Sequence, residues 1–174
     1  MFFKNQTKEE NSMKKVMALI FVIVMVFGLT GCRAVERQEA LLDYINNDVA
    51  ELGTIEEELL ASYESVSGEN YTDDLEMYTE FTSNTSDLAR NLNEKAVEIA
   101  EEITDEEILE VHRLYMNYSN KFMSVINLMI SALENQDITL AVEANEKLNE
   151  ANNYALDFRK ALSRLAEKRD VEFK

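Results

Sequence analysis

Hydrophobic residues return every three or four positions over four long stretches of this chain, which is the spacing of one face of an α-helix. The stretches are residues 34–66, 73–103, 104–133 and 137–168. Each would be roughly 45 Å long at 1.5 Å per residue, and the connections between them are short. The pattern therefore predicts an all-α fold, an antiparallel up-down-up-down four-helix bundle. A looser pair of helical hairpins, or a dimer, is the alternative.

Several polar or flexible residues mark where these helices begin, end or weaken. Gly53 lies inside the first stretch and costs a helix about 1 kcal/mol relative to alanine, so we expect a break or bend there. Residues 67–72, SGENYT, predict a loop. The run TSNTS, residues 82–86, weakens the second stretch because its side chains compete for backbone hydrogen bonds. The expected N-caps of the third and fourth helices are Thr104, which pairs with Glu107, and Asp137.

The third stretch carries two apolar stripes instead of one, so it is predicted to be the most buried helix. The only histidine of the chain, His112, lies beside one stripe and is expected at the boundary between core and solvent. Tyrosines occur near core-facing positions of all four stretches, and we expect their rings at the edge of the core with the hydroxyls in solvent. A shared aromatic pocket is the alternative, with the candidate residues Tyr63, Tyr78, Tyr115, Tyr118 and Tyr154.

Composition supports the helical prediction and adds a strong negative charge. The 174 residues include no proline, no tryptophan and only four glycines, which is too little turn chemistry for a fold of many short strands. The net charge is −17, and because residues 1–31 carry a net +2, the rest of the chain carries −19. Such a surface repels phosphate groups. We therefore expect no nucleic acid among the partners.

Residues 16–28, VMALIFVIVMVFG, form an apolar run that follows Lys14 and Lys15 and precedes Thr30 and Gly31. A basic start, a short apolar core and small residues at the end are the order of a secretory signal peptide. A transmembrane helix needs about 20 apolar residues, so an uncleaved anchor is the second interpretation. The chain from Met13 onward gives the most compact leader, and we expect translation to start there.

The last four residues of this segment, Leu29, Thr30, Gly31 and Cys32, resemble the lipobox of bacterial lipoproteins, and Cys32 is the only cysteine. The resemblance implies that the Cys32 thiol receives a diacylglyceryl group and that signal peptidase II cuts between Gly31 and Cys32. A thiolate is a good nucleophile for such an alkylation. Two acyl chains hold a protein durably on a bilayer.

These inferences divide the chain into a lipoprotein signal peptide, residues 1–31, and an acidic helical-bundle domain, residues 32–174. The domain would stand on the extracytoplasmic face of the cell membrane, anchored through the lipid on Cys32. Arg33 replaces the acidic residue associated with inner-membrane retention in Gram-negative lipoproteins, and the composition is rich in Lys, Asn and Glu. Both features favour a Gram-positive source.

The sequence patterns offer little catalytic chemistry. Leu109 stands three residues before His112, so the Glu-x-x-His signature of di-iron bundles is missing. The acidic groups at 72–74 and 104–107 lie where helices begin, and the helix dipole explains them. One histidine does not complete a convincing Ser-His-Asp arrangement, and the sequence has no glycine-rich phosphate loop. We therefore expect neither an enzyme, nor a metal site, nor a cofactor.

Two classes of function remain. The first is a noncatalytic helical interaction module at the cell envelope, which contacts a basic envelope protein or wall component through its acidic faces. The second is a lipoprotein that binds a small molecule or peptide in the tyrosine-lined pocket. A third idea, an immunity or exclusion lipoprotein that guards the membrane, would need support from the genomic neighbourhood.

Overall fold

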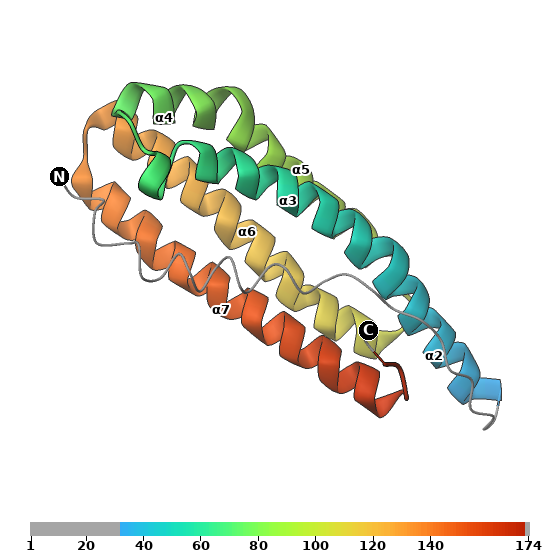
Figure 1. Cartoon of the computed structure of the whole chain (residues 1–174). Helices are drawn as coiled ribbons and strands as arrows, with labels where there is room; N and C mark the ends of the chain where they lie inside the picture. The colour runs from blue at the N-terminus through green and yellow to red at the C-terminus, as the bar shows by residue number, and fades with distance from the viewer. Residues whose placement is uncertain (1–31, 173–174) are drawn as a thin grey trace.

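A computed structural model of the protein describes residues 32–172, in which every regular element is a helix (Figure 1). The first long helix consists of α2 (Cys32–Asp43), the π-helical turn η2 (Tyr44–Val49) and α3 (Ala50–Ser65). The second consists of α4 (Asp74–Glu80), the π-helical turn η4 (Phe81–Thr85) and α5 (Ser86–Glu102). The third and fourth are α6 (Glu106–Asn135) and α7 (Ile138–Lys168), and the 3₁₀ turn η3 (Gly68–Asn70) lies between α3 and α4.

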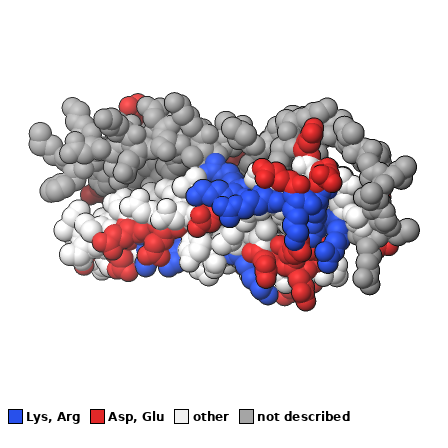
Figure 2. Space-filling model, turned by 90° about the horizontal axis from the view of Figure 1, so that it is seen from below, with Lys and Arg blue, Asp and Glu red and all other residues white. Residues whose placement is uncertain are grey.

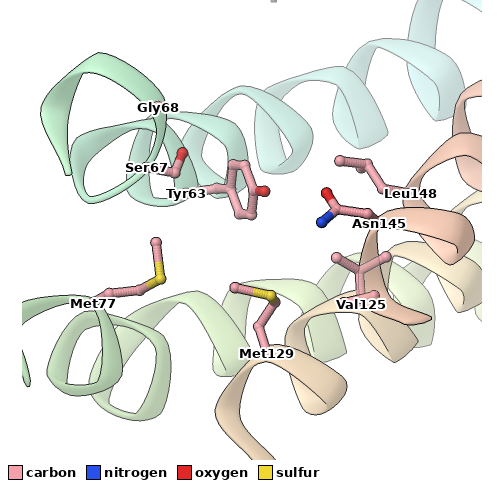
Figure 3. Close-up of a pocket in the computed structure, with 9 residues that line it drawn as sticks. Tyr63, Ser67, Gly68, Met77, Val125, Met129, Asn145 and Leu148 are labelled. Atoms are coloured by element: carbon pink, nitrogen blue, oxygen red, sulfur yellow. The ribbon is translucent and has the colours of Figure 1, made fainter. Parts of the chain in front are cut away.

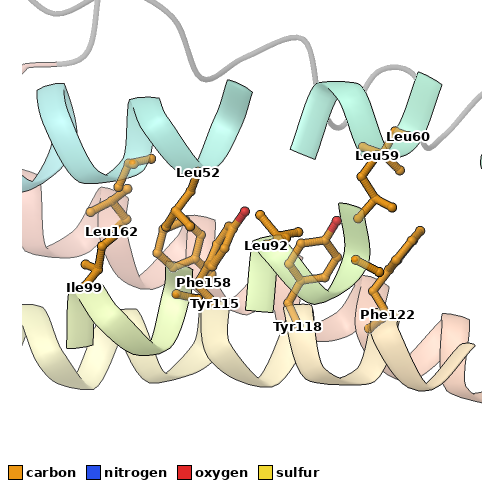
Figure 4. Packing of buried hydrophobic residues seen from close by; sticks show 14 of the residues in the cluster. Leu52, Leu59, Leu60, Leu92, Ile99, Tyr115, Tyr118, Phe122, Phe158 and Leu162 are labelled. Carbon is orange, nitrogen blue, oxygen red and sulfur yellow. The ribbon is translucent and has the colours of Figure 1, made fainter. Parts of the chain in front are cut away.

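The four long helices pack as a bundle around one apolar core, so the predicted all-α bundle is confirmed. α6 packs against α4, α5 and α7, and among residues 32–172 it buries more side chains than any other long helix, as predicted. Figure 4 shows leucines and aromatic rings of all four helices meeting in this core, among them Leu52, Leu59, Leu92, Tyr115, Tyr118, Phe122, Phe158 and Leu162. The predicted signal peptide, residues 1–31 with Leu29, Thr30 and Gly31, lies outside the described residues.

Small side chains bring α6 and α7 together as the most closely packed pair of helices. Ala144, Ala151 and Ala166 of α7 are buried at 1% exposure or less. Because a methyl group occupies little space, the two backbones approach closely along the whole seam. α3 and α7 do not form such a closely packed pair. The rings of Tyr115 on α6 and Phe158 on α7 meet edge to face in the core, with 5.2 Å between their centroids.

The helix boundaries confirm one predicted N-cap and correct another. Asp137 accepts a hydrogen bond from the backbone N–H of Thr139 at 2.9 Å, as expected for the N-cap of α7. The N-cap of α6 is Asp105, one residue beyond the predicted Thr104, because its carboxylate accepts bonds from the two free N–H groups of residues 107 and 108. A carboxylate there also suits the helix dipole better than a hydroxyl does.

The expected break at Gly53 is wrong, because α3 runs through this residue without interruption. Helical packing of its neighbours outweighs the cost of one glycine. The irregularity of this helix lies earlier, at η2, where a π turn inserts an extra residue into the turn. No sequence pattern predicted η2.

The predicted weak point in the second helix coincides with η4. Thr85, at the end of this turn, is fully buried, and its Oγ1 lies 2.7 Å from Oγ of Ser62 on α3. Ser62 in turn donates to a carboxylate oxygen of Glu80 at 2.7 Å. The π turn therefore directs the Thr85 hydroxyl inward, where Ser62 of α3 provides a hydrogen-bond partner.

Charged residues close the end of the bundle at which α2 and the end of α7 lie (Figure 1). The Arg169 guanidinium donates to the carboxylate of Asp105 at 2.8 Å and to the backbone carbonyl of Arg37 at 2.8 Å. Its side chain is 6% exposed. Arg169 thus connects the end of α7 to the start of α6 and to α2, which fixes α2 against the bundle.

Candidate functional site

Cys32, the residue that the lipobox resemblance makes the lipid acceptor, is the first residue of α2. Between Ala34 and Asp43 the first buried side chain is Leu41. The nine residue steps from Cys32 to Leu41 correspond to roughly 14 Å of helix. A lipid on Cys32 would therefore be joined to the core by a helix, with no flexible spacer between them.

A buried carboxylate connects α3 to α6. Glu56 on α3 is 8% exposed and accepts a hydrogen bond from the Tyr115 hydroxyl at 2.9 Å and another from the Tyr118 hydroxyl at 2.8 Å. The two tyrosine rings meet edge to face, with 5.5 Å between their centroids. Figure 4 shows both hydroxyls pointing toward α3 between apolar neighbours. We call Glu56, Tyr115 and Tyr118 the Glu–Tyr cluster.

Burial is the largest influence on the Glu56 carboxyl and raises its pKa above the usual value of 4.5. The hydrogen bonds from Tyr118 and Tyr115 and the positive charge of Arg159 on α7 act in the opposite direction without cancelling it. Burial and the neighbouring carboxylate also raise the pKa of both tyrosines. At neutral pH the tyrosines therefore stay protonated and donate to Glu56.

His112 forms the second buried polar group, one helical turn from Tyr115. Its side chain is fully buried, so its expected position at the core boundary is wrong. Nε2 lies 2.6 Å from the backbone oxygen of Ala96, and Nδ1 lies 2.9 Å from the Tyr44 hydroxyl. Because a carbonyl oxygen only accepts, Nε2 carries the proton and Tyr44 donates to Nδ1. His112 thereby connects α5 to the π turn η2.

Desolvation lowers the pKa of His112 below its usual value of 6.5, although the bond to the Ala96 carbonyl opposes this shift. The neutral ring fits its two partners, because a second ring proton would face the Tyr44 hydroxyl that now donates to it. As the pH falls through 6.5, the unfolded chain binds a proton that the folded chain resists. His112 therefore contributes a loss of stability as the pH falls below about 6.5.

Replacing His112 with glutamine is expected to lower the free energy of unfolding by about 1–3 kcal/mol at pH 7.5, because one of its two partners loses its bond. The difference from wild type should shrink between pH 7.5 and pH 5. Only the wild type has a histidine at this position, and protonation of that histidine in the unfolded chain lowers the stability as the pH falls. Urea unfolding across this range measures both effects. Asn117→Gln, on the exposed face of α6, should stay within about 0.5 kcal/mol, and a difference independent of pH would contradict the assignment.

The structure brings together only some of the five tyrosines proposed for a pocket. Tyr115 and Tyr118 belong to the Glu–Tyr cluster, and their hydroxyls are buried against Glu56. The expectation that these hydroxyls lie in solvent is therefore wrong. Tyr63 stacks on Phe81 instead, with 5.6 Å between ring centroids. Tyr78 donates to Glu134 at the surface at 2.9 Å, and Tyr154 is partly buried against the core.

A small cavity lies between α3, α4, α6 and α7, and of the five tyrosines only Tyr63 lines it (Figure 3). Figure 3 shows the thioethers of Met77 and Met129 beside this space. Its volume is about 10 Å³. That is room for about one water molecule, whereas sites for small molecules usually measure about 300–1,000 Å³.

Glu56 was not among the predicted site residues and His112 was predicted at the core boundary, although the spacing of apolar residues contained a signal for both. Glu56 follows Leu52 by four residues and precedes Leu59 by three, which is the spacing of a core position. His112 has the same relation to Ile108 and Tyr115. A charged or polar residue at such a position predicts a buried, hydrogen-bonded group, because burial without a partner is costly.

Each of these buried polar side chains has hydrogen-bond partners, Glu56 in the two tyrosine hydroxyls and His112 in the Tyr44 hydroxyl and the Ala96 carbonyl. We find no group of three or more metal-binding side chains placed to hold an ion among residues 32–172. No helix in this part of the chain has the length and apolar character needed to cross a membrane. The geometry of the Glu–Tyr cluster suits a role in aligning α3 with α6.

Charge is distributed unevenly along the bundle. All twelve Lys and Arg residues between positions 32 and 172 lie in 32–56, 90–121 and 147–172. Residues 57–89 and 122–146 contain thirteen Asp and Glu and no Lys or Arg. We call these residues the distal half, because they surround the ends of the helices farthest from α2 (Figure 1). Figure 2 shows the largest group of Lys and Arg side chains toward the end that carries α2.

Comparison with protein-family models, with curated proteins and with solved structures finds no match to this chain.

Proposed function

We propose that this chain is a lipoprotein of the cell envelope, attached to the extracytoplasmic face of the cell membrane through Cys32, and that it acts as a noncatalytic interaction module. Its partner is a basic envelope protein or wall component. The observation that carries the proposal is the separation of charge along the bundle, with a distal half that has no positive residue. An acidic surface of this kind attracts a basic partner and speeds its association.

The architecture that we infer for this role is the antiparallel up-down-up-down bundle. Short connections join consecutive helices, and α6 packs against both its chain neighbours, α5 and α7. With the anchor at Cys32, this topology holds the distal half away from the membrane. Repulsion between acidic side chains and anionic headgroups favours the same orientation. The alternative, a tyrosine-lined binding pocket, gains no support from a cavity of about 10 Å³.

Affinity capture tests this function with the full chain in intact membranes after mild crosslinking. We expect a defined set of basic partners whose yield falls when the salt concentration rises from about 0.05 M to 0.5 M, because salt screens charges that are more than a few ångströms apart. A yield that does not depend on salt would contradict recognition by the acidic faces.

A matched pair of charge variants identifies which half of the bundle binds the basic partners. The distal variant replaces Glu69, Glu143 and Glu146 with glutamine, and the control replaces Glu36, Glu39 and Glu167 in the same way. All six side chains are exposed, and both variants remove three negative charges. We expect the distal variant to lower the yield several-fold and the control to leave it near the wild-type value.

A further inference from the structure

Exposed apolar side chains gather in the distal half of the bundle, which contains no Lys or Arg of its own. At its border, Asp87 forms an ion pair with Arg90, and Glu143 lies near enough to Lys147 to raise the pKa of that lysine. Five large hydrophobic side chains are exposed among the described residues, and three of them lie here: Leu75 on α4 and Ile138 and Val142 on α7. Their exposed fractions are 73%, 56% and 54%. The other two, Val97 and Leu156, are 40% and 38% exposed and lie in the half that carries the basic residues.

Ile138 and Val142 are four residues apart on α7, so their side chains are neighbours on one face of that helix. We call these two residues the distal apolar pair. Glu143 and Glu146, both exposed, follow on the same part of α7. Leu75 lies at the same end of the bundle, because Met77 two residues later and Ala144 of α7 line one cavity.

Charge determines what can cover this pair. A second copy of the chain would bring a second distal half with thirteen acidic and no basic residues against the first, and like charges at an interface oppose association. An anionic lipid surface is disfavoured for the same reason. A ligand with an apolar face bordered by Lys or Arg has complementary charge and also buries the pair.

We propose that the distal apolar pair and the acidic residues around it form a docking site for a basic amphipathic helix of a partner protein. The proposal rests on the proposed function and names the surface and the chemistry of its partner. Apolar contact with Ile138 and Val142 provides the specificity, and the carboxylates around them attract and orient the basic residues.

Binding of a synthetic probe to the full chain tests this site. The probe is an 18-residue helix of Leu and Lys with one apolar face, and its control is a scrambled peptide of the same composition. The protein is purified from membranes into phosphatidylcholine nanodiscs, with empty discs as the blank. Fluorescence anisotropy then gives the dissociation constant of each peptide at low and at physiological salt.

We expect the wild type to bind the amphipathic probe at least tenfold more tightly than the scrambled peptide, with weaker binding at higher salt. Ile138→Gln combined with Val142→Gln should weaken binding about tenfold or more. Glutamine is a good helix former, so α7 should persist, as circular dichroism can verify. Leu156→Gln, an exposed apolar site in the other half of the same helix, should leave binding unchanged.

Three results would overturn the docking site: equal binding of both peptides, equal binding by the wild type and the double variant, or an equal loss with Leu156→Gln. A wild-type dimer that the double variant dissociates, measured by light scattering, would also overturn it in favour of self-association. Failure of the proposed function is distinct, because membrane capture would then recover no salt-sensitive partner. If the wild type and the double variant capture the same partners equally, the docking site is contradicted but the proposed function is not.

Discussion

Replacing Cys32 with serine is expected to abolish both lipid attachment and cleavage of the leader, so that the polypeptide keeps the residues before position 32. The lipobox resemblance makes the Cys32 thiol the acceptor, and a serine hydroxyl is not ionised at neutral pH as a thiol partly is. Each acyl chain contributes about 0.8 kcal/mol per buried methylene to membrane binding. The variant therefore lacks the proposed lipid anchor and keeps the apolar leader, residues 16–28, instead.

Mass spectrometry of the amino terminus, together with labelling by a fatty-acid analogue, measures this outcome. The wild type should begin at a lipid-modified Cys32, and Cys32→Ser should carry no label. Arg33→Ser is the matched control, because it makes a substitution one residue later and leaves residues 29–32 intact. An unlabelled wild type that still carries residues 16–28 would instead establish the uncleaved anchor as the correct interpretation.

Replacing Glu56 with alanine is expected to lower the free energy of unfolding by about 3–4 kcal/mol. The substitution removes the acceptor of two buried tyrosine hydroxyls, at 2.9 and 2.8 Å, and the negative charge near Arg159. Buried polar groups that lose a partner cost about 1–3 kcal/mol each. Urea unfolding measures the loss. Glu57→Ala, at the exposed neighbouring position, should cost no more than about 0.5 kcal/mol, and equal losses would contradict a structural role for the Glu–Tyr cluster.

Glu56→Gln separates the charge of this side chain from its shape. Burial raises the pKa of Glu56 above 4.5, so as the pH rises above that value the folded chain retains a proton that the unfolded chain releases. The contribution of Glu56 to stability is therefore greatest below about pH 4.5 and declines as the pH rises through the folded pKa. Glutamine has no such dependence, and the cost of Glu56→Gln should be smaller at pH 7 than at pH 4.

The order and extent of the helices followed from the sequence because they depend on local chemistry. Apolar residues at intervals of three and four mark a helix wherever one face is buried. The loop at 67–72, the cap at Asp137 and the end of the last helix at Lys168 agree with the structure. The cap at Asp105 was missed by one residue, because a threonine and an aspartate side by side both satisfy the same local rule.

Of the two candidate sites, one could be predicted from local sequence and the other could not. Cys32 was proposed as the lipid acceptor from the residues around it alone, since the resemblance to a lipobox is a local pattern that does not depend on the fold. The exposed pair Ile138 and Val142 could not be predicted in this way, because apolar residues at helical spacing usually face the core. Which of them stay outside depends on where α7 meets α6, and alanines set that seam.

By itself the sequence determined the four helices, their approximate ends, the strong negative charge and the candidate lipid acceptor, because each depends on residue type and spacing along the chain. Only the tertiary structure decided that Glu56 meets Tyr115 and Tyr118, and that His112 lies between Ala96 and Tyr44. These partners are between 16 and 68 residues apart in the chain. The physical reason is that a buried polar side chain is tolerated only where the packing of other helices supplies its hydrogen bonds.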